Sequence, residues 1–217
     1  MTDLLSSSNS PAGRRSGRSR DTAKRDAILE SAHSLFFQRG VEGTTIEDVA
    51  AGAGVSKVTV YGHFGDKLTL FEACVRRAVA MMEQGLIQSP PRGDSLRECL
   101  FAMGVPLLRF LTSAELIAFD RSLSVEAVRH PELARRFFEA GPYHCRAKLA
   151  ELIAAGRDRG EVVIDNPIQG AEDLINLWYG MLHKELAMGR IPSPGTAEID
   201  RRVQHGIQVF MRAYGAR

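Results

Sequence analysis

The sequence has few cysteines and no long apolar segment. Cys74, Cys99 and Cys145 lie far apart and show no Cys-x-x-Cys or Cys/His spacing, which argues against a disulfide framework or a zinc module. No segment approaches the roughly 18 uninterrupted apolar residues of a membrane span, and the N-terminus has no apolar core of a secretory signal. We therefore expect a reduced, cytoplasmic protein with no membrane segment, no metal and no other cofactor.

Catalytic signatures are also lacking. Gly52-Ala53-Gly54 has no third glycine and no preceding strand, so it is not a dinucleotide fingerprint. Tyr143-His144-Cys145 places a nucleophile next to a base, but adjacent helical residues point about 100° apart. No Gly-x-Ser-x-Gly, zinc-helix or paired-carboxylate pattern occurs. The sequence predicts no catalytic residues and does not favour an enzyme.

What is present is the balance of a soluble globular chain. The 217 residues are 44% hydrophobic and 25% charged, with a formal net charge of +2, which is enough chain for one or two domains. A nearly neutral chain is not coated with basic residues. Any site for nucleic acid must therefore be local.

The first 21 residues are polar and predict a disordered basic arm. They contain Arg14, Arg15, Arg18 and Arg20. A Ser/Arg-rich transit peptide is the alternative, but no amphipathic pattern supports it. The arm could reach phosphates or a narrow minor groove, or serve only to keep the chain soluble.

From Thr22 onward, apolar residues recur at helical spacing and strand alternation is absent, so we predict an all-α fold. A first helix is expected over residues 22–39, ending at Gly40. Two short helices follow, over 46–51 and 57–64. Thr44 and Glu47 have the spacing of a capping box for the first of them, and Ser56 is a suitable N-cap for the second.

The segment 50–55 predicts a tight turn between these short helices. Ala50 is small where two backbones would touch, and Gly54 tolerates a positive φ. Val49, Val55 and Val60 would form an apolar wedge between the helices. This spacing is typical of a helix-turn-helix whose second helix enters the DNA major groove.

Segments 44–50 (TTIEDVA) and 53–67 (AGVSKVTVYGHFGDK) resemble the DNA-binding signature of the TetR family. Gly62 and Leu68-Thr69 depart from the family pattern, which puts single phosphate contacts in doubt but not the module. The resemblance implies a DNA-binding domain over 22–67 and a larger helical domain over 68–217 that binds a small molecule and dimerises. Segment 129–142 further resembles regulators with an AefR-like C-terminal domain.

Candidate DNA contacts lie mainly on the second short helix. Lys57 and Thr59 could read base edges, and Val58 could contact a thymine methyl group. The predicted phosphate contacts are Thr45, Tyr61, His63 and Lys67. Ser56, the capping residue, completes the predicted DNA-binding set. For His63, burial against the first helix is an equal alternative.

Two apolar faces near the C-terminus predict a homodimer through the last two helices. The first contains Ile168, Ala171, Leu174, Ile175, Trp178 and Leu182, and the second contains Ile199, Val203, Ile207, Phe210 and Tyr214. Alternatively, these faces close the core of one subunit. Helix breakers that divide the domain are expected at residues 89–91, 130–131, 160, 166–167 and 192–195.

An effector pocket would combine aromatic walls with a few polar groups. The candidates are Phe110, Phe119, Arg121, Tyr143, Trp178 and His183, although each type is common in cores and on surfaces. Pro106 and Gly141-Pro142 could kink helices and open space for a ligand. The helix expected over 66–82, with Val75 and Val79 on its apolar face, is the predicted lever between the domains.

The sequence thus predicts a dimeric regulator, most simply a repressor. It would bind a pseudo-palindromic double-stranded operator and be released by a small-molecule effector of unidentified chemistry. The alternative is a ligand-binding helical protein or small enzyme with a vestigial helix-turn-helix. Binding to operator DNA distinguishes the two.

Overall fold

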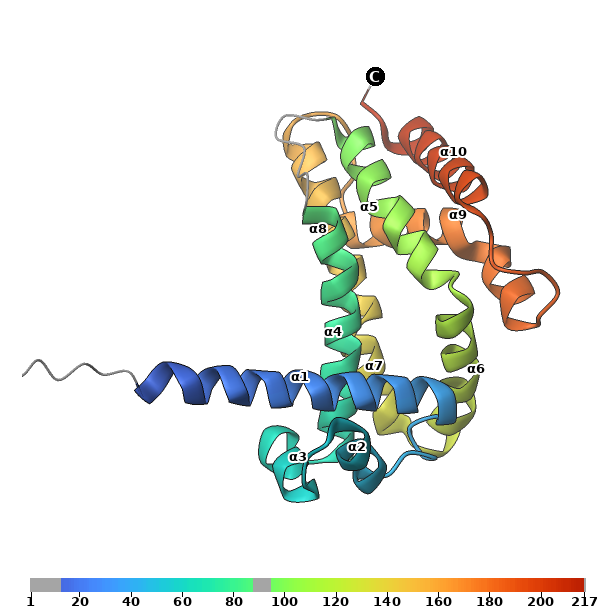
Figure 1. Ribbon diagram of the computed structural model, residues 1–217. Coiled ribbons are helices and arrows are strands. Elements are labelled where there is room, and N and C mark those ends of the chain that lie inside the picture. The colour runs from blue at the N-terminus through green and yellow to red at the C-terminus, as the bar shows by residue number, and fades with distance from the viewer. Residues whose placement is uncertain (1–12, 88–94, 217) are drawn as a thin grey trace, which may run out of the picture.

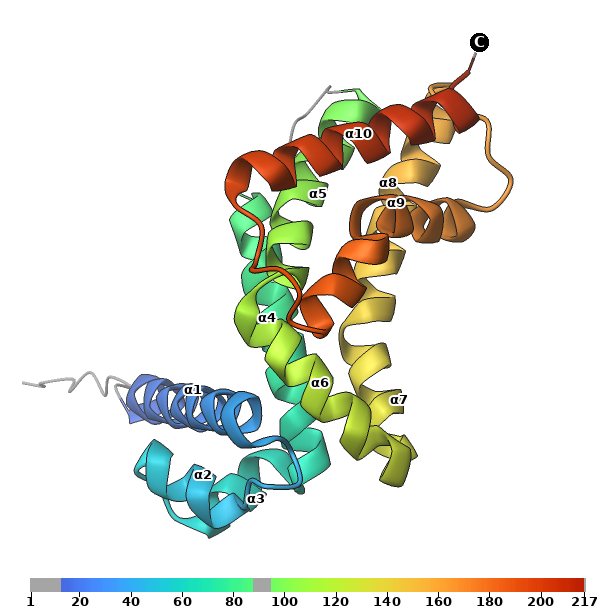
Figure 2. The same ribbon diagram turned by 90° about the vertical axis from the view of Figure 1, so that its right-hand side faces the viewer.

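The computed structural model describes residues 13–87 and 95–216, and within them the chain folds into helices and loops with one isolated β-bridge between Val162 and Gly215. The all-α prediction is confirmed (Figures 1 and 2). The helices are α1 (Gly13–Arg39), α2 (Ile46–Ala53), α3 (Lys57–Phe64), α4 (Lys67–Ile87), α5 (Leu96–Leu111), α6 (Ala114–Arg129), α7 (Pro131–Ala140), α8 (Pro142–Asp158), α9 (Pro167–Ala187) and α10 (Thr196–Tyr214). No single helix in the described ranges is both long and apolar enough to cross a bilayer.

The first helix begins earlier than predicted. α1 starts at Gly13, so residues 13–21, which we expected to be disordered, are helical, while residues 1–12 lie outside the described part. Extending an existing helix avoids the cost of a new nucleus, and arginine is a good helix former. The polar composition of this segment therefore did not predict its helical backbone conformation.

Most predicted helix breakers are confirmed. Gly40 and Gly160 have φ values of 74° and 76°, in the left-handed region, just after α1 and α8. Asn166 caps α9 by accepting hydrogen bonds from two backbone amides, and the predicted break at 130–131 separates α6 from α7. The break at 89–91 lies outside the described residues.

The interior contains two apolar clusters. One joins α1–α4 to Phe119, Leu123 and Leu133 from α6 and α7, and the other lies among α5, α8, α9 and α10. α4 runs from the first group of helices to the second (Figure 1), and α6 contacts α1 of the first group and α9 of the second. α4 and α6 thus connect the two parts.

The apolar faces of α9 and α10 are buried within the subunit, so the assignment of these side chains to the dimer interface was wrong. The buried members are Ala171, Leu174, Trp178, Leu182, Ile199, Val203, Ile207 and Phe210. Periodicity identifies an apolar face but not what covers it, and here α5 and α8 complete the cluster. Leu177 and Met181 are the large apolar side chains that α9 exposes near its kink at Gly180.

Trp178 is closely packed in this cluster. Its indole Nε1 donates to the carbonyl oxygen of Val203 over 3.2 Å. A Cβ atom on Gly206 would lie 2.5 Å from the ring, and one on Gly104 would lie 2.8 Å from it. Two glycines therefore make room for the indole.

We expect Gly206→Ala to unfold at lower urea concentration than Gly62→Ala. Alanine gains helix propensity in both helices, but only at Gly206 would the new methyl group overlap Trp178, whereas Gly62 has open space around it. The difference between the variants should be about 1–3 kcal/mol in the free energy of unfolding. Urea unfolding at one protein concentration measures it, and equal stability of the two variants would contradict the packing described.

A candidate DNA-binding surface and an adjoining pocket

The entry to α2 is capped one residue later than predicted. Thr45, not Thr44, is the N-cap: its hydroxyl accepts from the Asp48 amide over 3.1 Å, and the Thr45 amide donates to the Asp48 carboxylate over 3.1 Å. The Thr45 hydroxyl also donates to the Asp48 carboxylate over 2.7 Å, and this bond, followed by that from the Thr45 amide, lowers the pKa of Asp48. Thr44 is buried, and its hydroxyl donates to the Gly40 carbonyl. Because two threonines are adjacent, the sequence alone did not show which of them is the N-cap of the capping box.

The turn between α2 and α3 has the predicted form. Gly54 adopts φ 65° and ψ 32°, and its amide donates back to the carbonyls at the end of α2. Val49 and Val60 are buried between the helices, and Val55 is half-buried against them. Ser56 caps α3 by accepting from the Thr59 amide over 3.2 Å. The geometry is that of a helix-turn-helix.

One face of α3 is open to solvent. Val58 is 73% exposed and Tyr61 is 47% exposed. Lys57 is also exposed, and its ammonium group lies 3.3 Å from the Glu47 carboxylate. Because both side chains are open to solvent, this ion pair contributes little free energy, and Lys57 can leave Glu47 for another acceptor at small cost. Thr59 is half-buried beside the cap, with its hydroxyl 2.9 Å from that of Ser56. Lys57, Val58 and Tyr61 therefore form the accessible surface of the helix.

Three other predicted contacts already have partners within the chain. The Lys67 ammonium group donates to the Thr44 carbonyl over 3.0 Å. The His63 side chain is mostly buried and faces Asp21 of α1 at 3.4 Å, which favours the packing alternative. Thr45 is exposed but engaged in its cap. These side chains fix α2 and α3 relative to α1 and α4, and their phosphate contacts stay a prediction.

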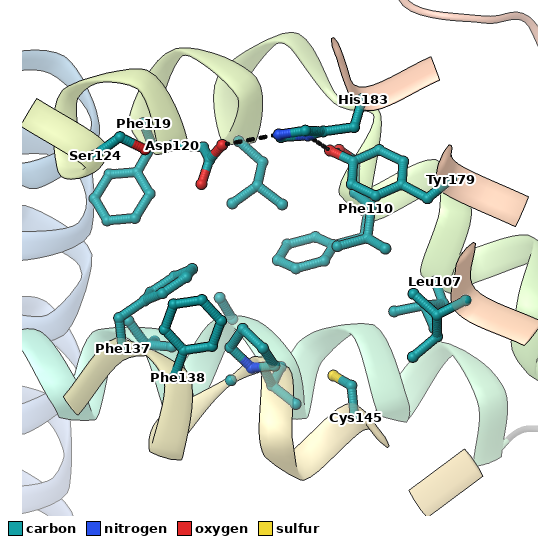
Figure 3. A pocket seen from close by; sticks show the side chains of 18 of the residues that line it. Leu107, Phe110, Phe119, Asp120, Ser124, Phe137, Phe138, Cys145, Tyr179 and His183 are labelled. Carbon is teal, nitrogen blue, oxygen red and sulfur yellow. Dashed lines mark hydrogen bonds and ion pairs between the residues drawn. The ribbon is translucent and has the colours of Figure 1, made fainter. Parts of the chain in front are cut away.

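A pocket of about 430 Å³ lies where the two apolar clusters meet. Of the predicted pocket residues, Phe110, Phe119 and His183 line it, and α4 contributes Val75 and Val79 as its expected apolar face. Further lining residues that the sequence reasoning missed are Phe37, Asp120, Ser124, Phe137, Phe138, Cys145 and Tyr179. Figure 3 shows the aromatic rings of α5, α6 and α7 around one cavity.

Arg121, Tyr143 and Trp178 do not line the pocket, contrary to our expectation. The Arg121 guanidinium donates to the Leu186 carbonyl over 2.8 Å, and Trp178 fills the core. Tyr143 is 48% exposed, and the Arg146 guanidinium lies over its ring at 4.7 Å. Aromatic or charged character alone does not say which way a side chain points from its helix.

A polar corner interrupts the apolar wall. The His183 Nδ1 lies 2.7 Å from the Tyr179 hydroxyl, and that hydroxyl donates to the Leu111 carbonyl over 2.9 Å. On the other side of the ring, the His183 Nε2 lies 3.6 Å from the Asp120 carboxylate (Figure 3). Burial, followed by the charge of Asp120, raises the pKa of Tyr179. Tyr179 is four residues before His183, a helical spacing that could have revealed it.

The two predicted kinks have different outcomes. Gly141-Pro142 does not bend one helix but separates α7 from α8, and both residues line the pocket. A Cβ atom on Gly141 would lie 3.1 Å from Val75 of α4, so glycine allows a close approach there. Pro106 lies inside α5 and lines a neighbouring cleft between α1, α4 and α5.

α6 connects the pocket directly to the helix-turn-helix. Its Phe119 lines the pocket and stacks on Phe37 of α1, with ring centroids 4.5 Å apart. Two turns later, the buried Glu126 carboxylate accepts from the amides of Val41 and Glu42 over 3.1 and 3.0 Å. These amides belong to the turn between α1 and α2. A displacement of α6 would therefore act on the DNA-binding part without passing through α4.

Comparison with protein families matches both parts of the chain. Residues 28–74 match the model described as bacterial regulatory proteins, tetR family. Residues 98–216 match the C-terminal domain of AefR-like transcriptional repressors. The two matches agree with the resemblances found in the sequence, and together they cover the helix-turn-helix and most of the larger helical part.

Individual relatives are transcriptional regulators. The HTH-type transcriptional regulator EthR of Mycobacterium tuberculosis is 29% identical over 182 residues, 81% of each chain. The HTH-type transcriptional repressor BepR of Brucella suis is 38% identical over 65 residues, which span 31% of that protein. The solved structure of the Flavonoid-responsive Regulator FrrA has a TM-score of 0.73 and 27% identity, covering 90% of this chain and 99% of that one.

We expect Lys57→Ala to weaken binding to a duplex selected by the wild-type protein from a random library by about 1–3 kcal/mol, and to weaken binding to a scrambled duplex much less. The reason is the exposed position of Lys57 at the start of α3. Lys67→Ala should weaken both duplexes alike. Fluorescence anisotropy with each duplex measures the effect, with Lys148→Ala on α8 as the matched control. Equal losses on both duplexes for Lys57→Ala would reassign it to phosphate contact.

Proposed function

Because the chain belongs to the TetR family of bacterial transcriptional regulators, we propose that it represses transcription by binding a pseudo-palindromic operator as a homodimer. A small molecule in the pocket among α4 to α9 releases it from DNA. The observation that carries the proposal is the direct connection of that pocket to the helix-turn-helix through Phe119 and Glu126.

The accessible face of α3 supports the DNA-binding role. An exposed lysine, an exposed valine and a half-exposed tyrosine at the start and middle of a capped helix can reach base edges and phosphates. A vestigial helix-turn-helix would be free to lose this surface and its caps. Their presence favours the regulator over a ligand-binding protein or enzyme with a disused module. Proteins of this family bind operators as dimers, and two-fold symmetry suits paired half-sites.

The dimer interface is part of the proposal. We retain α9 and α10 as the interface, but through the faces that the core leaves exposed. Leu177 and Met181 on α9 are the apolar side chains available there. The neighbouring face of α10 is polar, with Gln204, His205 and Gln208 exposed.

The pocket supports the effector role. Its walls are mainly apolar and aromatic with a few convergent polar groups, which is the usual form of a small-molecule site. FrrA, which resembles this chain over most of its length, is described as flavonoid-responsive, so hydroxylated flavonoids are the first effectors to test. By linkage, a ligand that favours the conformation with lower operator affinity must itself bind more weakly when operator is bound.

We expect Glu126→Gln to weaken this linkage. The substitution removes the negative charge that holds the Val41 and Glu42 amides, so a shift of α6 is passed on less completely. The ratio of operator affinities without and with a flavonoid effector should fall severalfold, corresponding to about 1 kcal/mol of coupling. Fluorescence anisotropy at saturating effector measures the ratio.

Glu115→Gln is the matched control, because Glu115 is exposed in the first turn of the same helix. It should keep the wild-type ratio. Calorimetry without DNA checks that both variants still bind the effector with wild-type affinity. An unchanged ratio in a folded Glu126→Gln protein would place the coupling elsewhere, with α4 as the remaining candidate.

A further inference from the structure

The polar corner of the pocket has an incomplete hydrogen-bond arrangement. Asp120 on α6 and His183 on α9 both line the cavity, and their closest polar atoms are 3.6 Å apart. That separation is too long for a direct hydrogen bond. The two groups therefore face the same space, and both can take a further hydrogen-bonding partner there.

The neighbouring contacts assign the donors. The Tyr179 hydroxyl has one proton and gives it to the Leu111 carbonyl, since a carbonyl can only accept. The hydroxyl must then accept from the His183 Nδ1–H, which is 2.7 Å away. This fixes the imidazole ring with its Nε2 directed toward Asp120. The only proton of the Tyr179 hydroxyl is used, so Asp120 and the His183 Nε2 are the acceptors available to a ligand's donor.

The charge of the corner selects against anions. Among the described residues that line this pocket there is no lysine or arginine, whereas Asp120 supplies a carboxylate. A ligand carboxylate or phosphate would meet that negative charge without a fixed cation to compensate for it. The Nε2 of an imidazole that carries its proton on Nδ1 accepts, as the Asp120 carboxylate does, so a ligand hydroxyl can donate into the space between these two acceptors.

The remaining walls select for a planar apolar body. Phe110, Phe119, Phe137 and Phe138 surround the cavity, and Val79 and Leu107 complete its apolar wall. Phenylalanine rings pack well against other aromatic rings in offset or edge arrangements. Figure 3 shows the polar corner on one side of the cavity, with Phe137, Phe138 and Cys145 across from it.

We propose that the pocket is specific for non-anionic aromatic compounds whose hydroxyl group donates to Asp120 beside the His183 Nε2. The proposal rests on the effector role of the pocket proposed above, and it names the chemical class of the effector. It places the hydroxyl between α6 and α9, so this group determines specificity. The aromatic body supplies most of the buried apolar area.

The test compares four probes of the same ring system by titration calorimetry with the full-length protein in the absence of DNA. They are 2-naphthol, 2-methoxynaphthalene, 2-naphthoate and 2-naphthylmethylammonium. We expect 2-naphthol to bind about tenfold more tightly than the methyl ether, which cannot donate, and more tightly still than the carboxylate. Tighter binding of the ether, the carboxylate or the ammonium compound, or no binding of 2-naphthol, would overturn the proposal.

Asp120→Asn tests the assigned acceptor. Because the amide can donate to an ether oxygen, the preference for 2-naphthol over 2-methoxynaphthalene should fall to within about twofold. Asp165→Asn makes the same change at an exposed position before α9 and should keep the wild-type preference. A tenfold preference that persists in Asp120→Asn would contradict the assignment.

The outcomes separate this inference from the proposed function. A wild-type protein that shows the probe preference but selects no duplex from a random library would retain the pocket chemistry and refute the operator role. A protein that selects a duplex and shows no preference for 2-naphthol would retain the operator role and refute the hydroxyl-specific pocket.

Discussion

The attachment of α6 to the turn that leads into α2 depends on one buried carboxylate. A carboxylate removed from water must find hydrogen-bond donors, and Glu126 finds them in the Val41 and Glu42 amides and the Ser122 hydroxyl. Those amides follow Gly40, where α1 ends with a positive φ, and a Cβ atom on Gly40 would lie 2.0 Å from the Glu126 carboxylate. Glycine is thus required there by both its backbone and its neighbour. The start of α2 is thereby attached to α6.

Local features of this arrangement were predictable from the sequence, whereas contacts between distant helices were not. The bounds of α3, its Ser56 cap and the left-handed Gly54 follow from neighbouring residues, and all three are confirmed. The dependence on Glu126 was not visible, because its partners lie 84 and 85 residues away in the chain. The same limit explains Trp178: periodicity placed it on an apolar face, but only the packing of α5 and α10 shows that this face is core.

The pocket occupies the junction of the two apolar clusters. Phe119 belongs to the cluster around α1 to α4, while Val79, Leu107 and Cys145 belong to the other, and all four line the cavity. Protein interiors are otherwise close-packed, so space at a junction is where two rigid parts can most easily shift relative to one another. A ligand that fills it contacts both clusters at once. Its binding therefore favours one relative placement of the two parts over others.

The energies of the hydrogen bonds to Glu126 determine whether a displacement of α6 is passed on to the turn between α1 and α2. Phe119 and Glu126 are seven residues apart on α6, about two helical turns, so both move with the helix. Detaching Glu126 would break two hydrogen bonds to a charged acceptor, each contributing about 1.5–3 kcal/mol. Coupling between effector and operator sites is typically only about 1–3 kcal/mol in total. Breaking both bonds would thus cost as much as or more than the coupling itself, so we infer that the turn between α1 and α2 follows α6 and carries α3 with it.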